Sequence, residues 1–289
     1  MNREPLVSIL MTAYNREQYI GQAIDSVLAS TYENFELIVV DDTSTDKTIE
    51  IAQSYAARDS RIRVYINEKN LGDYPNRNKA ASYANGKFIM FVDSDDKILI
   101  DGLERCVNIM QQFPHAKFGM QLHGNEDVPF YLEPRQAINQ HFFQKPFLLI
   151  GPGGTIIRRS FFEGIGKYPE LYGPANDMYF NLKAAASSGV LLLPFSFNFY
   201  RIHEGQEQNN KYSYLYNNYN YLRDALQKIS LPLSFEQIEW IQNKNRRRFL
   251  VNILTFLLYT GNIIKFLRAI KLSGFHMRDV RKAVVHRSL

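Results

Sequence analysis

The first hundred residues alternate between short apolar runs that are typical of buried strands and segments with apolar residues at helical spacing. The strand-like runs occupy residues 7–11, 35–40, 63–66 and 88–92, and helical patterns lie between them. Such alternation requires crossover connections, which are right-handed and place helices on both faces of a mostly parallel sheet. The predicted fold class is therefore α/β, with a Rossmann-like twisted sheet.

Polar residues directly follow three of these predicted strands. Tyr14-Asn15 follows the first run, Asp41-Asp42 the second and Asp93-Ser94-Asp95 the fourth. Ligands of open α/β sheets bind outside the carboxyl ends of the strands. Three clusters that are far apart in the sequence are thus predicted to form one binding site.

The Asp-x-Asp pair indicates a site for a divalent cation. Two carboxylates at i and i+2 can hold a hard cation such as Mg2+ or Mn2+, whose other positions go to water and substrate phosphates. Such an ion neutralises a departing diphosphate. An isolated Asp-x-Asp is more often a solvated turn, but the predicted convergence of clusters favours the metal interpretation. His203 is either a further ligand or a hydrogen-bonded side chain, and both interpretations stay open.

Two other acids have a functional and a structural interpretation. Asp42 can accept hydrogen bonds from a base or a ribose, or it can cap the following helix. Thr45 and Asp46 are better placed for capping, which favours a binding role for Asp42. Asp177 lies at the start of a predicted helix, where Asn176 is the expected cap.

Four ordered motifs resemble those of the family 2 glycosyltransferases of the GT-A fold. They are Thr12-Ala13-Tyr14-Asn15, Val39-Val40-Asp41-Asp42, Arg77-Asn78-Lys79-Ala80 and Asp93-Ser94-Asp95-Asp96. The resemblance is dense over residues 6–100 and thins out towards residue 205, across a stretch at 124–154 that is predicted to be rich in loops. It implies a metal-dependent enzyme that transfers a sugar with inversion from a nucleotide-diphospho-sugar, in particular a UDP-sugar, to a hydroxyl acceptor.

The resemblance also implies roles for individual residues. A base must take the proton of the attacking hydroxyl, and a carboxylate suffices for this. The implied assignments are Asp177 as the catalytic base, Thr12, Tyr14, Asp42, Arg77 and Asp93 as nucleotide-binding residues, and Asp95 with His203, from Tyr200-Arg201-Ile202-His203, on Mn2+ or Mg2+.

Several positions depart from the family pattern. Asn176 stands where an acid is more usual, so Asp177 alone can be the base. Asp73-Tyr74-Pro75 replaces the small residues common before Arg77, which suggests a different donor sugar. Thr43 replaces a common Gly after Asp42, a change that is conservative for a turn but not free of cost.

An Asn- and Tyr-rich run at residues 209–221 marks a shift in composition, which predicts a glycosyltransferase domain at residues 1–205 and a basic amphipathic helical extension at 206–289. From residue 240 to the end, eleven Lys or Arg stand against one acid, so this segment carries +10 and the remainder −5. The apolar stretch 249–264 is too short to span a bilayer, which takes about 20 residues. It predicts a helix at a membrane surface, with packing on the domain or a homodimer contact as alternatives.

Other classes of protein fit the sequence less well. A sugar nucleotidyltransferase would carry a Gly-rich basic loop where residues 12–16 lie, and no Walker or G-x-S-x-G motif occurs. A non-catalytic membrane- or polyanion-binding protein is the other alternative, and no nucleic-acid partner is predicted. One cysteine and an N-terminus without a secretory signal predict a cytoplasmic protein. The expected role is surface polysaccharide synthesis on a glycan or lipid-linked acceptor.

Overall fold

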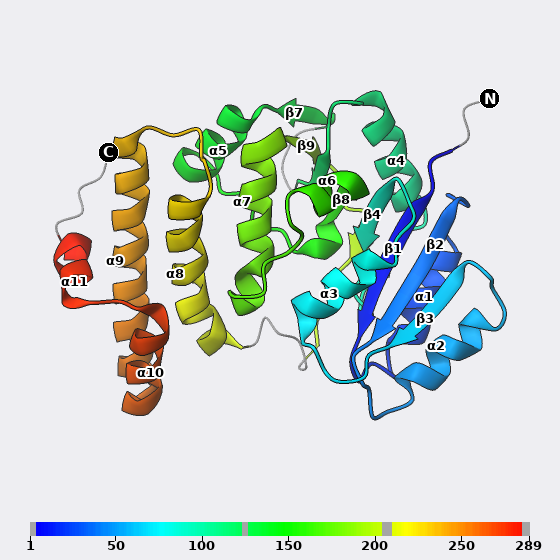
Figure 1. Cartoon of the computed structure of the whole chain (residues 1–289), viewed down its shortest axis with the longest axis horizontal. Helices are drawn as coiled ribbons and strands as arrows, with labels where there is room; N and C mark the ends of the chain where they lie inside the picture. Colours follow the sequence, from blue (N-terminus) through cyan, green and yellow to red (C-terminus); the bar gives the residue numbers. More distant parts are fainter. Residues whose placement is uncertain (1–3, 123–126, 204–209, 285–289) are drawn as a thin grey trace.

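An eight-stranded twisted sheet forms the centre of the protein (Figure 1), for which the computed structural model describes residues 4–122, 127–203 and 210–284. Its strand order is β3-β2-β1-β4-β8-β6-β9-β7, and β10 pairs with β5 in a separate ribbon. The strands are β1 (Val7–Ala13), β2 (Phe35–Asp41), β3 (Ile62–Ile66), β4 (Phe88–Phe91), β5 (Lys97–Ile98), β6 (Phe118–Gln121), β7 (Phe130–Leu132), β8 (Thr155–Arg158), β9 (Val190–Leu193) and β10 (Asn198–Phe199).

The first four strands of the sheet form its parallel half. β1 pairs in parallel with β2 and β4, and β2 pairs in parallel with β3. β8 then runs antiparallel between β4 and β6, while β6 and β9 are parallel. Four of the seven pairings in this sheet are parallel, so the predicted mostly parallel α/β sheet is confirmed.

Helices cover both faces because successive strand residues point to opposite sides. Val7, Ile9 and Met11 of β1 join the core of one face, and Leu10 joins that of the other. The first face is covered by α1 (Ile20–Leu28), α2 (Thr48–Ala56) and α4 (Gly102–Gln112). The second is covered by α3 (Asp73–Ser82), α5 (Pro134–Phe143), α6 (Arg159–Gly164) and α7 (Asn176–Ser188).

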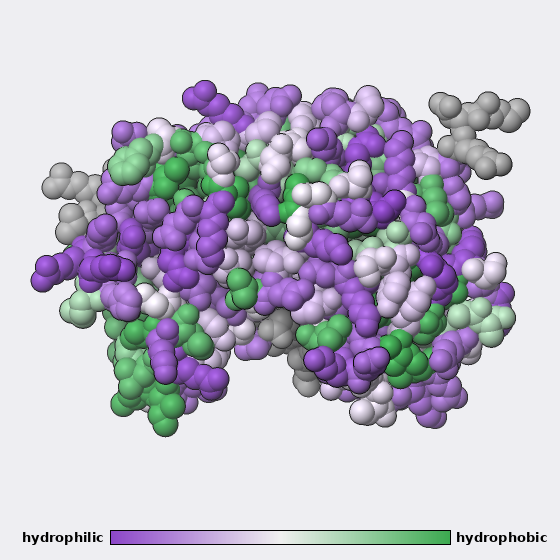
Figure 2. Space-filling model, viewed as in Figure 1, coloured by the Kyte–Doolittle hydropathy of each residue, from purple (hydrophilic) through white to green (hydrophobic). Residues whose placement is uncertain are grey.

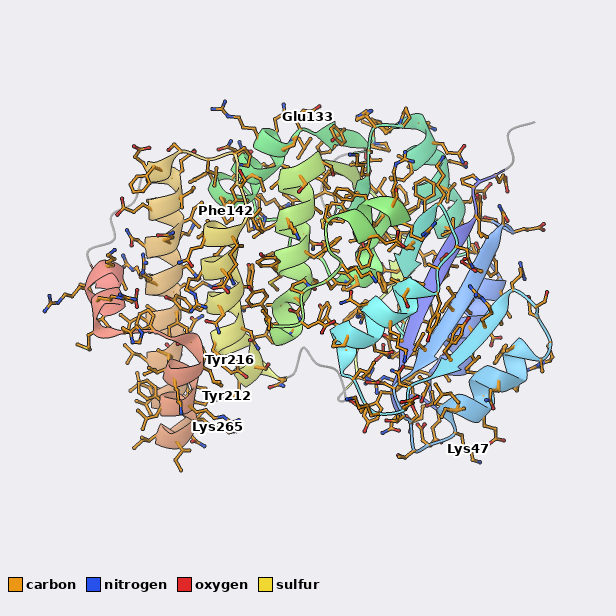
Figure 3. The ribbon with its side chains drawn as sticks, in the orientation of Figure 1. Lys47, Glu133, Phe142, Tyr212, Tyr216 and Lys265 are labelled. Carbon is orange, nitrogen blue, oxygen red and sulfur yellow. The ribbon has the colours of Figure 1, made fainter. Side chains whose placement is uncertain are left out.

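Helix α5 lies in a stretch, residues 124–154, for which the sequence predicted mostly loop. Glu133 caps it in a reciprocal capping box with Gln136, and Pro134 occupies its first turn, where no backbone N–H is needed. Ala137 and Ile138 are buried in the second core, and Phe142 packs against it (Figure 3). The loop expectation was therefore wrong for residues 134–143.

Four further helices follow: α8 (Lys211–Lys228), α9 (Phe235–Thr260), α10 (Ile263–Ser273) and α11 (Met277–Val284). Tyr221 and Ala225 of α8 and Ile241 of α9 are buried in the core of the second face. The start of the extension thus packs on the sheet domain, while its far end has a cluster of its own around Phe249. Within the described residues, no helix is both long enough and apolar enough to cross a membrane. Apolar side chains are nevertheless exposed at the ends of α9 and α10 (Figure 2).

Candidate active site

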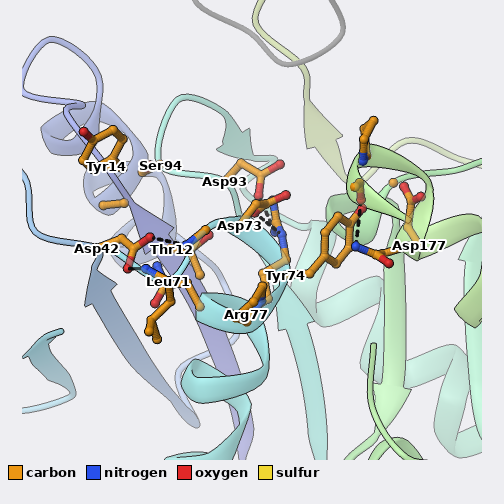
Figure 4. Close-up of a pocket in the computed structure, with 18 of the residues that line it drawn as sticks. Thr12, Tyr14, Asp42, Leu71, Asp73, Tyr74, Arg77, Asp93, Ser94 and Asp177 are labelled. Atoms are coloured by element: carbon orange, nitrogen blue, oxygen red, sulfur yellow. Dashed lines mark hydrogen bonds and ion pairs between the residues drawn. The ribbon is translucent and has the colours of Figure 1, made fainter. Parts of the chain in front are cut away.

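A cavity of about 680 Å³ opens at the carboxyl ends of β1, β2 and β4. Asp42 with Thr12 and Tyr14 lies on one side of it and Asp177 on the other, with Asp73, Arg77 and Asp93 between them (Figure 4). The cavity is lined by seven of the eight predicted site residues, namely Thr12, Tyr14, Asp42, Arg77, Asp93, Asp95 and Asp177. His203 lines an adjoining cavity of about 270 Å³ instead.

The Asp42 carboxylate holds the loop that enters α3. Its Oδ1 accepts hydrogen bonds from the Leu71 N–H at 2.8 Å and from Asn67 Nδ2 at 2.7 Å, and its Oδ2 accepts from the Gly72 N–H at 2.9 Å. Gly72 has a φ of 85°, a conformation that favours glycine. Asp46, not Asp42, accepts the hydrogen bonds of Thr48 at the start of α2. Asp42 therefore does not cap that helix, and it shapes the cavity wall that it also lines.

Thr43 is held in the left-handed region, with a φ of 66°. A β-branched residue there is strained by about 1–2 kcal/mol, and strain of this kind concentrates at functional sites. We expect Thr43→Gly to raise the free energy of unfolding by about 1 kcal/mol after the larger chain entropy of glycine is subtracted. Chemical denaturation would measure this. Thr45→Gly is the matched control, because Thr45 is not among the residues with positive φ, and it should destabilise; equal effects at both positions would contradict the strain.

Arg77 links two acids across the cavity floor. Its buried guanidinium donates from Nε to Asp73 Oδ1 and from Nη1 to Asp93 Oδ1, both at 2.7 Å. The Asp73 side chain remains 51% exposed and lines the cavity. A guanidinium shared between two carboxylates fixes their positions with charge-assisted hydrogen bonds. Arg77 thus orients Asp93 and leaves the second oxygen of Asp73 available to a ligand.

Asp95 lies between a cation and an imidazole. Its Oδ2 is 3.0 Å from Arg16 Nε and 3.0 Å from His203 Nε2, whose ring stacks on Tyr19. Among the described residues, no group of three or more acids, histidines or cysteines is placed to hold a metal. Mg2+ is commonly held by one or two carboxylates with substrate phosphates and water completing its shell. The carboxylate and imidazole donors of Asp95 and His203 therefore fit a divalent cation that binds together with a diphosphate.

The segment after β10 is fastened to the Asp-x-Asp turn. The Arg201 N–H donates to Asp96 Oδ1 at 2.9 Å, and Arg201 Nε donates to the Asp95 backbone carbonyl at 2.9 Å. Burial and the neighbouring acids raise the pKa of Asp96 to about 7. These bonds bring His203 to Asp95 from more than a hundred residues away along the chain.

Asp177 is buried in the first turn of α7. Burial raises its pKa to about 7, while the Met178 N–H, which donates to Oδ1 at 2.7 Å, and the Tyr74 hydroxyl lower it. A carboxylate with a pKa near 7 is well matched to proton abstraction at neutral pH. Asn176 was predicted to cap α7, but it is the first residue of the helix, and its side chain instead bonds the backbone of Tyr172 and Gly173.

A buried histidine and an asparagine support the loop beside Asp177. His141 Nδ1 accepts from the Phe147 N–H at 3.2 Å and the Leu148 N–H at 3.1 Å. Asn181 Nδ2 of α7 donates to the carbonyls of Leu148 and Ile150, next to the cavity-lining Gly151. This part of the cavity wall therefore depends on a neutral His141.

Acid should destabilise the protein through His141. Burial lowers its pKa from 6.5 to about 4, so the unfolded chain binds a proton that the folded chain excludes between these values. The contribution of the neutral histidine to stability is present above pH 6.5 and is lost as the pH falls to about 4. The free energy of unfolding should decrease by about 3 kcal/mol over this range. Urea unfolding of His141→Gln across this range should lack that part of the pH dependence. The exposed His115→Gln should keep it, and identical slopes in all three proteins would refute the assignment.

Several cavity residues were not found by sequence reasoning. Arg16 carries no motif signal for its contact with Asp95, whereas Asp73 and Tyr74 were noticeable as departures from the family pattern. Ser213 and Tyr214, in the first turn of α8, line the cavity from the predicted extension. An Asn- and Tyr-rich segment offers no pattern that would have placed them there.

Comparison with known proteins identifies a family model, described as glycosyl transferase family 2, that matches residues 8–166. A putative teichuronic acid biosynthesis glycosyltransferase of Bacillus subtilis is 42% identical over 111 residues, covering 38% of this chain and 44% of that protein. The Escherichia coli enzyme WfgD, a UDP-Glc:alpha-D-GlcNAc-diphosphoundecaprenol beta-1,3-glucosyltransferase, is 45% identical over 105 residues, or 36% of this chain and 41% of its own. The matches to the first three curated relatives span between 36% and 51% of the relatives' length.

Solved structures share the fold. TarS residues 1–349 of S. aureus, in complex with UDP-GlcNAc, superposes with a TM-score of 0.72 at 21% identity, over 96% of this chain and 81% of that one. The mannosyltransferase PcManGT of Pyrobaculum calidifontis, in complex with GDP-Man and Mn2+, gives 0.66 at 14% identity over 99% and 89%. The two alignments cover 96% and 99% of this chain, so the likeness in fold is not confined to the residues that the family model matches.

Proposed function

Because the chain belongs to glycosyl transferase family 2, we propose that it transfers a sugar with inversion from a nucleotide-diphospho-sugar to a hydroxyl group of a glycan or lipid-linked acceptor. The donor in this proposal is a UDP-sugar. The observation that carries it is the convergence of Asp42, Asp93 and Asp95 with the buried Asp177 around one cavity. Thr12, Tyr14, Asp42 and Asp93 hold the nucleotide, and Arg77 orients Asp93.

A divalent cation, Mn2+ or Mg2+, is part of the proposal. Among the described residues, five aspartates and Glu170 line the cavity, against Arg16 and Arg77 as cations, so an anionic diphosphate needs added positive charge. Asp95 and His203 would hold the ion, which when bound supplies charge neutralisation for the departing diphosphate. The Mn2+ bound to PcManGT, which has the same fold, supports the presence of a divalent cation in this proposal.

The proposed base is Asp177. An ionised Asp177 accepts the proton of the acceptor hydroxyl as its oxygen attacks the anomeric carbon and the bond to the diphosphate breaks. Tyr74 and the Met178 N–H orient the carboxylate for this step. The nucleotide therefore lies towards Asp42, and the acceptor enters on the Asp177 side, where Gly173, Pro174 and α8 line the cavity.

The acceptor belongs, in this proposal, to surface polysaccharide synthesis at the cytoplasmic face of a membrane. The names of the B. subtilis relative and of WfgD support an acceptor of this class. Residues 1–205 would carry the chemistry, although α8 of the 206–289 extension also contributes to the cavity wall. Contact of residues 240–289 with a membrane, or with a second copy of the chain, is a prediction.

A nucleotide-binding panel tests the proposal. UDP, GDP, CDP and dTDP are each added with and without Mn2+ or Mg2+, and thermal unfolding is followed. A ligand at a hundredfold excess over its Kd stabilises the folded state by about 2.7 kcal/mol. We expect a metal-dependent shift with UDP, followed by transfer from the matching UDP-sugar. A protein that gives no shift with any nucleotide would not be a transferase of this kind.

A further inference from the structure

Exposed apolar side chains cover the end of α9 and the start of α10, and we name this surface the tip. Its members are Leu254, Leu258, Tyr259, Ile263, Ile264 and Leu267, with exposed fractions from 45% at Leu254 to 88% at Tyr259. Leu254 and Leu258 are four residues apart, as are Ile263 and Leu267, so each pair shares a helix face. Figure 2 shows the tip as a green region at the lower left of the molecule. Monomeric soluble proteins rarely expose large contiguous apolar patches, so the tip indicates a partner.

The tip is not an unfilled part of the core. The opposite faces of the same helices are buried, with Phe249, Ile253 and Ala269 packed in one cluster with Tyr219 of α8 and Phe275. Both helices are therefore held in place by their inner faces. Their outer faces, which carry the tip, can therefore contact a partner surface.

The charge around the tip selects its partner. Lys265, Arg268 and Lys271 are exposed on α10, and Asp279, the one acid from residue 240 onwards, is buried and paired with Arg246 at 2.9 Å. Apolar residues flanked by cations suit an anionic lipid surface, where the cations meet headgroups and the apolar side chains enter the acyl boundary. A second copy of the same tip would bring like charges together, which opposes a homodimer through this surface.

Helix α8 connects the tip to the cavity. The Tyr212 hydroxyl donates to the Lys265 carbonyl at 2.9 Å, and the Lys265 ammonium lies 5.5 Å from the Tyr212 ring centroid (Figure 3). The next residues, Ser213 and Tyr214, line the cavity. The first turn of α8 thus contacts α10 through Tyr212 and the acceptor side of the cavity through the next two residues.

The tip and the cavity face the same edge of the molecule. In Figure 1 the strands β1 and β2 run towards the lower edge, and α9 descends to that edge as well, where α10 begins. A flat surface that contacts the tip would consequently lie beside the cavity mouth. The start of α9, where Phe235 lies, is at the opposite edge of the molecule.

We propose that the tip docks on an anionic membrane and turns the cavity mouth towards the lipid headgroups. An acceptor anchored in the bilayer can then reach Asp177 without leaving it. The membrane contact is inferred from the tip alone, whereas the identity of the acceptor rests on the proposed function.

Vesicle binding of the full chain tests the docking. The wild type should sediment with phosphatidylcholine vesicles that contain phosphatidylglycerol, less with phosphatidylcholine alone, and less at high salt. Leu258→Glu with Ile264→Glu, at sites 85% and 81% exposed, should weaken binding by at least roughly tenfold, because two apolar contacts become charges. Phe235→Glu, 77% exposed at the start of α9, is the matched control and should bind as the wild type does.

Two further measurements separate the alternatives. The metal-dependent thermal shift with UDP should be equal in all variants. Loss of vesicle binding with an unchanged shift would therefore show that the tip alone is affected. Absence of the shift in the wild type would instead contradict the proposed function. A wild type that does not bind vesicles, or a double variant that binds them equally well, overturns the docking. A wild-type dimer in light scattering that this double variant dissociates, without vesicle binding, would assign the tip to a second copy and likewise overturn it.

Fluorescence quenching by brominated lipids in the vesicles tests the orientation of the bound protein. A fluorophore on Leu258→Cys should be quenched strongly. One on the exposed Ile202→Cys, next in the chain to His203 of the adjoining cavity, should be quenched more weakly, and one on Phe235→Cys not at all. The native Cys106 is buried and does not compete for the label. Equal quenching at residues 202 and 235 would rule out a cavity mouth that faces the headgroups.

Discussion

Asp177→Asn is expected to reduce kcat by about 10²–10⁴-fold, because a positioned general base contributes that much to proton transfer. The amide keeps the size of the side chain but cannot accept the proton. Steady-state transfer from the UDP-sugar, together with the affinity for UDP, would measure the effect. The affinity should change little, since Asp177 lies across the cavity from Asp42. Asp25→Asn, an exposed carboxylate on α1 bonded to Tyr55, is the control and should keep wild-type kcat.

The same substitution should make the protein more stable above neutral pH. Burial raises the folded-state pKa of Asp177 from 3.8 to about 7, so its contribution to stability is present below pH 3.8 and is lost as the pH rises through about 7. At pH 8 the buried charge then costs about 4 kcal/mol, which the neutral amide avoids. Lower activity with a higher Tm at pH 8 would identify a carboxylate retained for function. Lower activity with a lower Tm would indicate a structural role instead.

The wild-type pH profile should report the same group. The base works only when it is ionised, so kcat/KM should rise with pH through about 7 and then reach a plateau. A profile that is flat from pH 5 to 8 would mean that another group takes the proton.

The parallel half of the sheet was predictable because its signals are local. Strand runs with alternating inward residues, turn residues after them and helical spacing between them each occupy a few consecutive positions. The polar clusters could be placed at one edge because the carboxyl ends of parallel strands must meet there. Helix α5 was missed because Pro134 and a mixed composition obscure a pattern in which Ala137, Ile138 and His141 alone form the buried face.

The pKa values and ion pairs of the site could not be predicted from the sequence. The pKa of Asp177 depends on its burial beneath Tyr74 of α3 and the loop at Gly151, which are distant in the chain. The Asp95 contacts combine Arg16 and His203, which lie on opposite sides of it in the sequence. Motifs identify which residue types are present, whereas solvation and ion pairing arise only when the elements pack.

Asp95→Asn is expected to abolish metal-dependent nucleotide binding and to lower kcat/KM by about three orders of magnitude or more. The substitution removes the negative charge that a divalent cation requires, and a cation on a diphosphate supplies several kcal/mol. The affinity for Mn2+ in the presence of UDP, followed by electron paramagnetic resonance, measures the cause apart from activity. Asp101→Asn, at a half-exposed acid paired with Arg105 outside the cavity, should leave both unchanged.

Arg16 allows the structural and the metal role of Asp95 to be separated. Without a metal, its guanidinium provides the positive charge beside Asp95 Oδ2, so Arg16 and the cation compete for the same carboxylate. If Asp95 binds the metal, Arg16→Gln should therefore bind Mn2+ more tightly than the wild type. If Asp95 is only the ion-pair partner of Arg16, the same substitution should lower Tm and leave the affinity for Mn2+ unchanged. If Asp95→Asn still binds Mn2+ with UDP as the wild type does, Asp95 is a structural partner of Arg16 and the metal lies elsewhere.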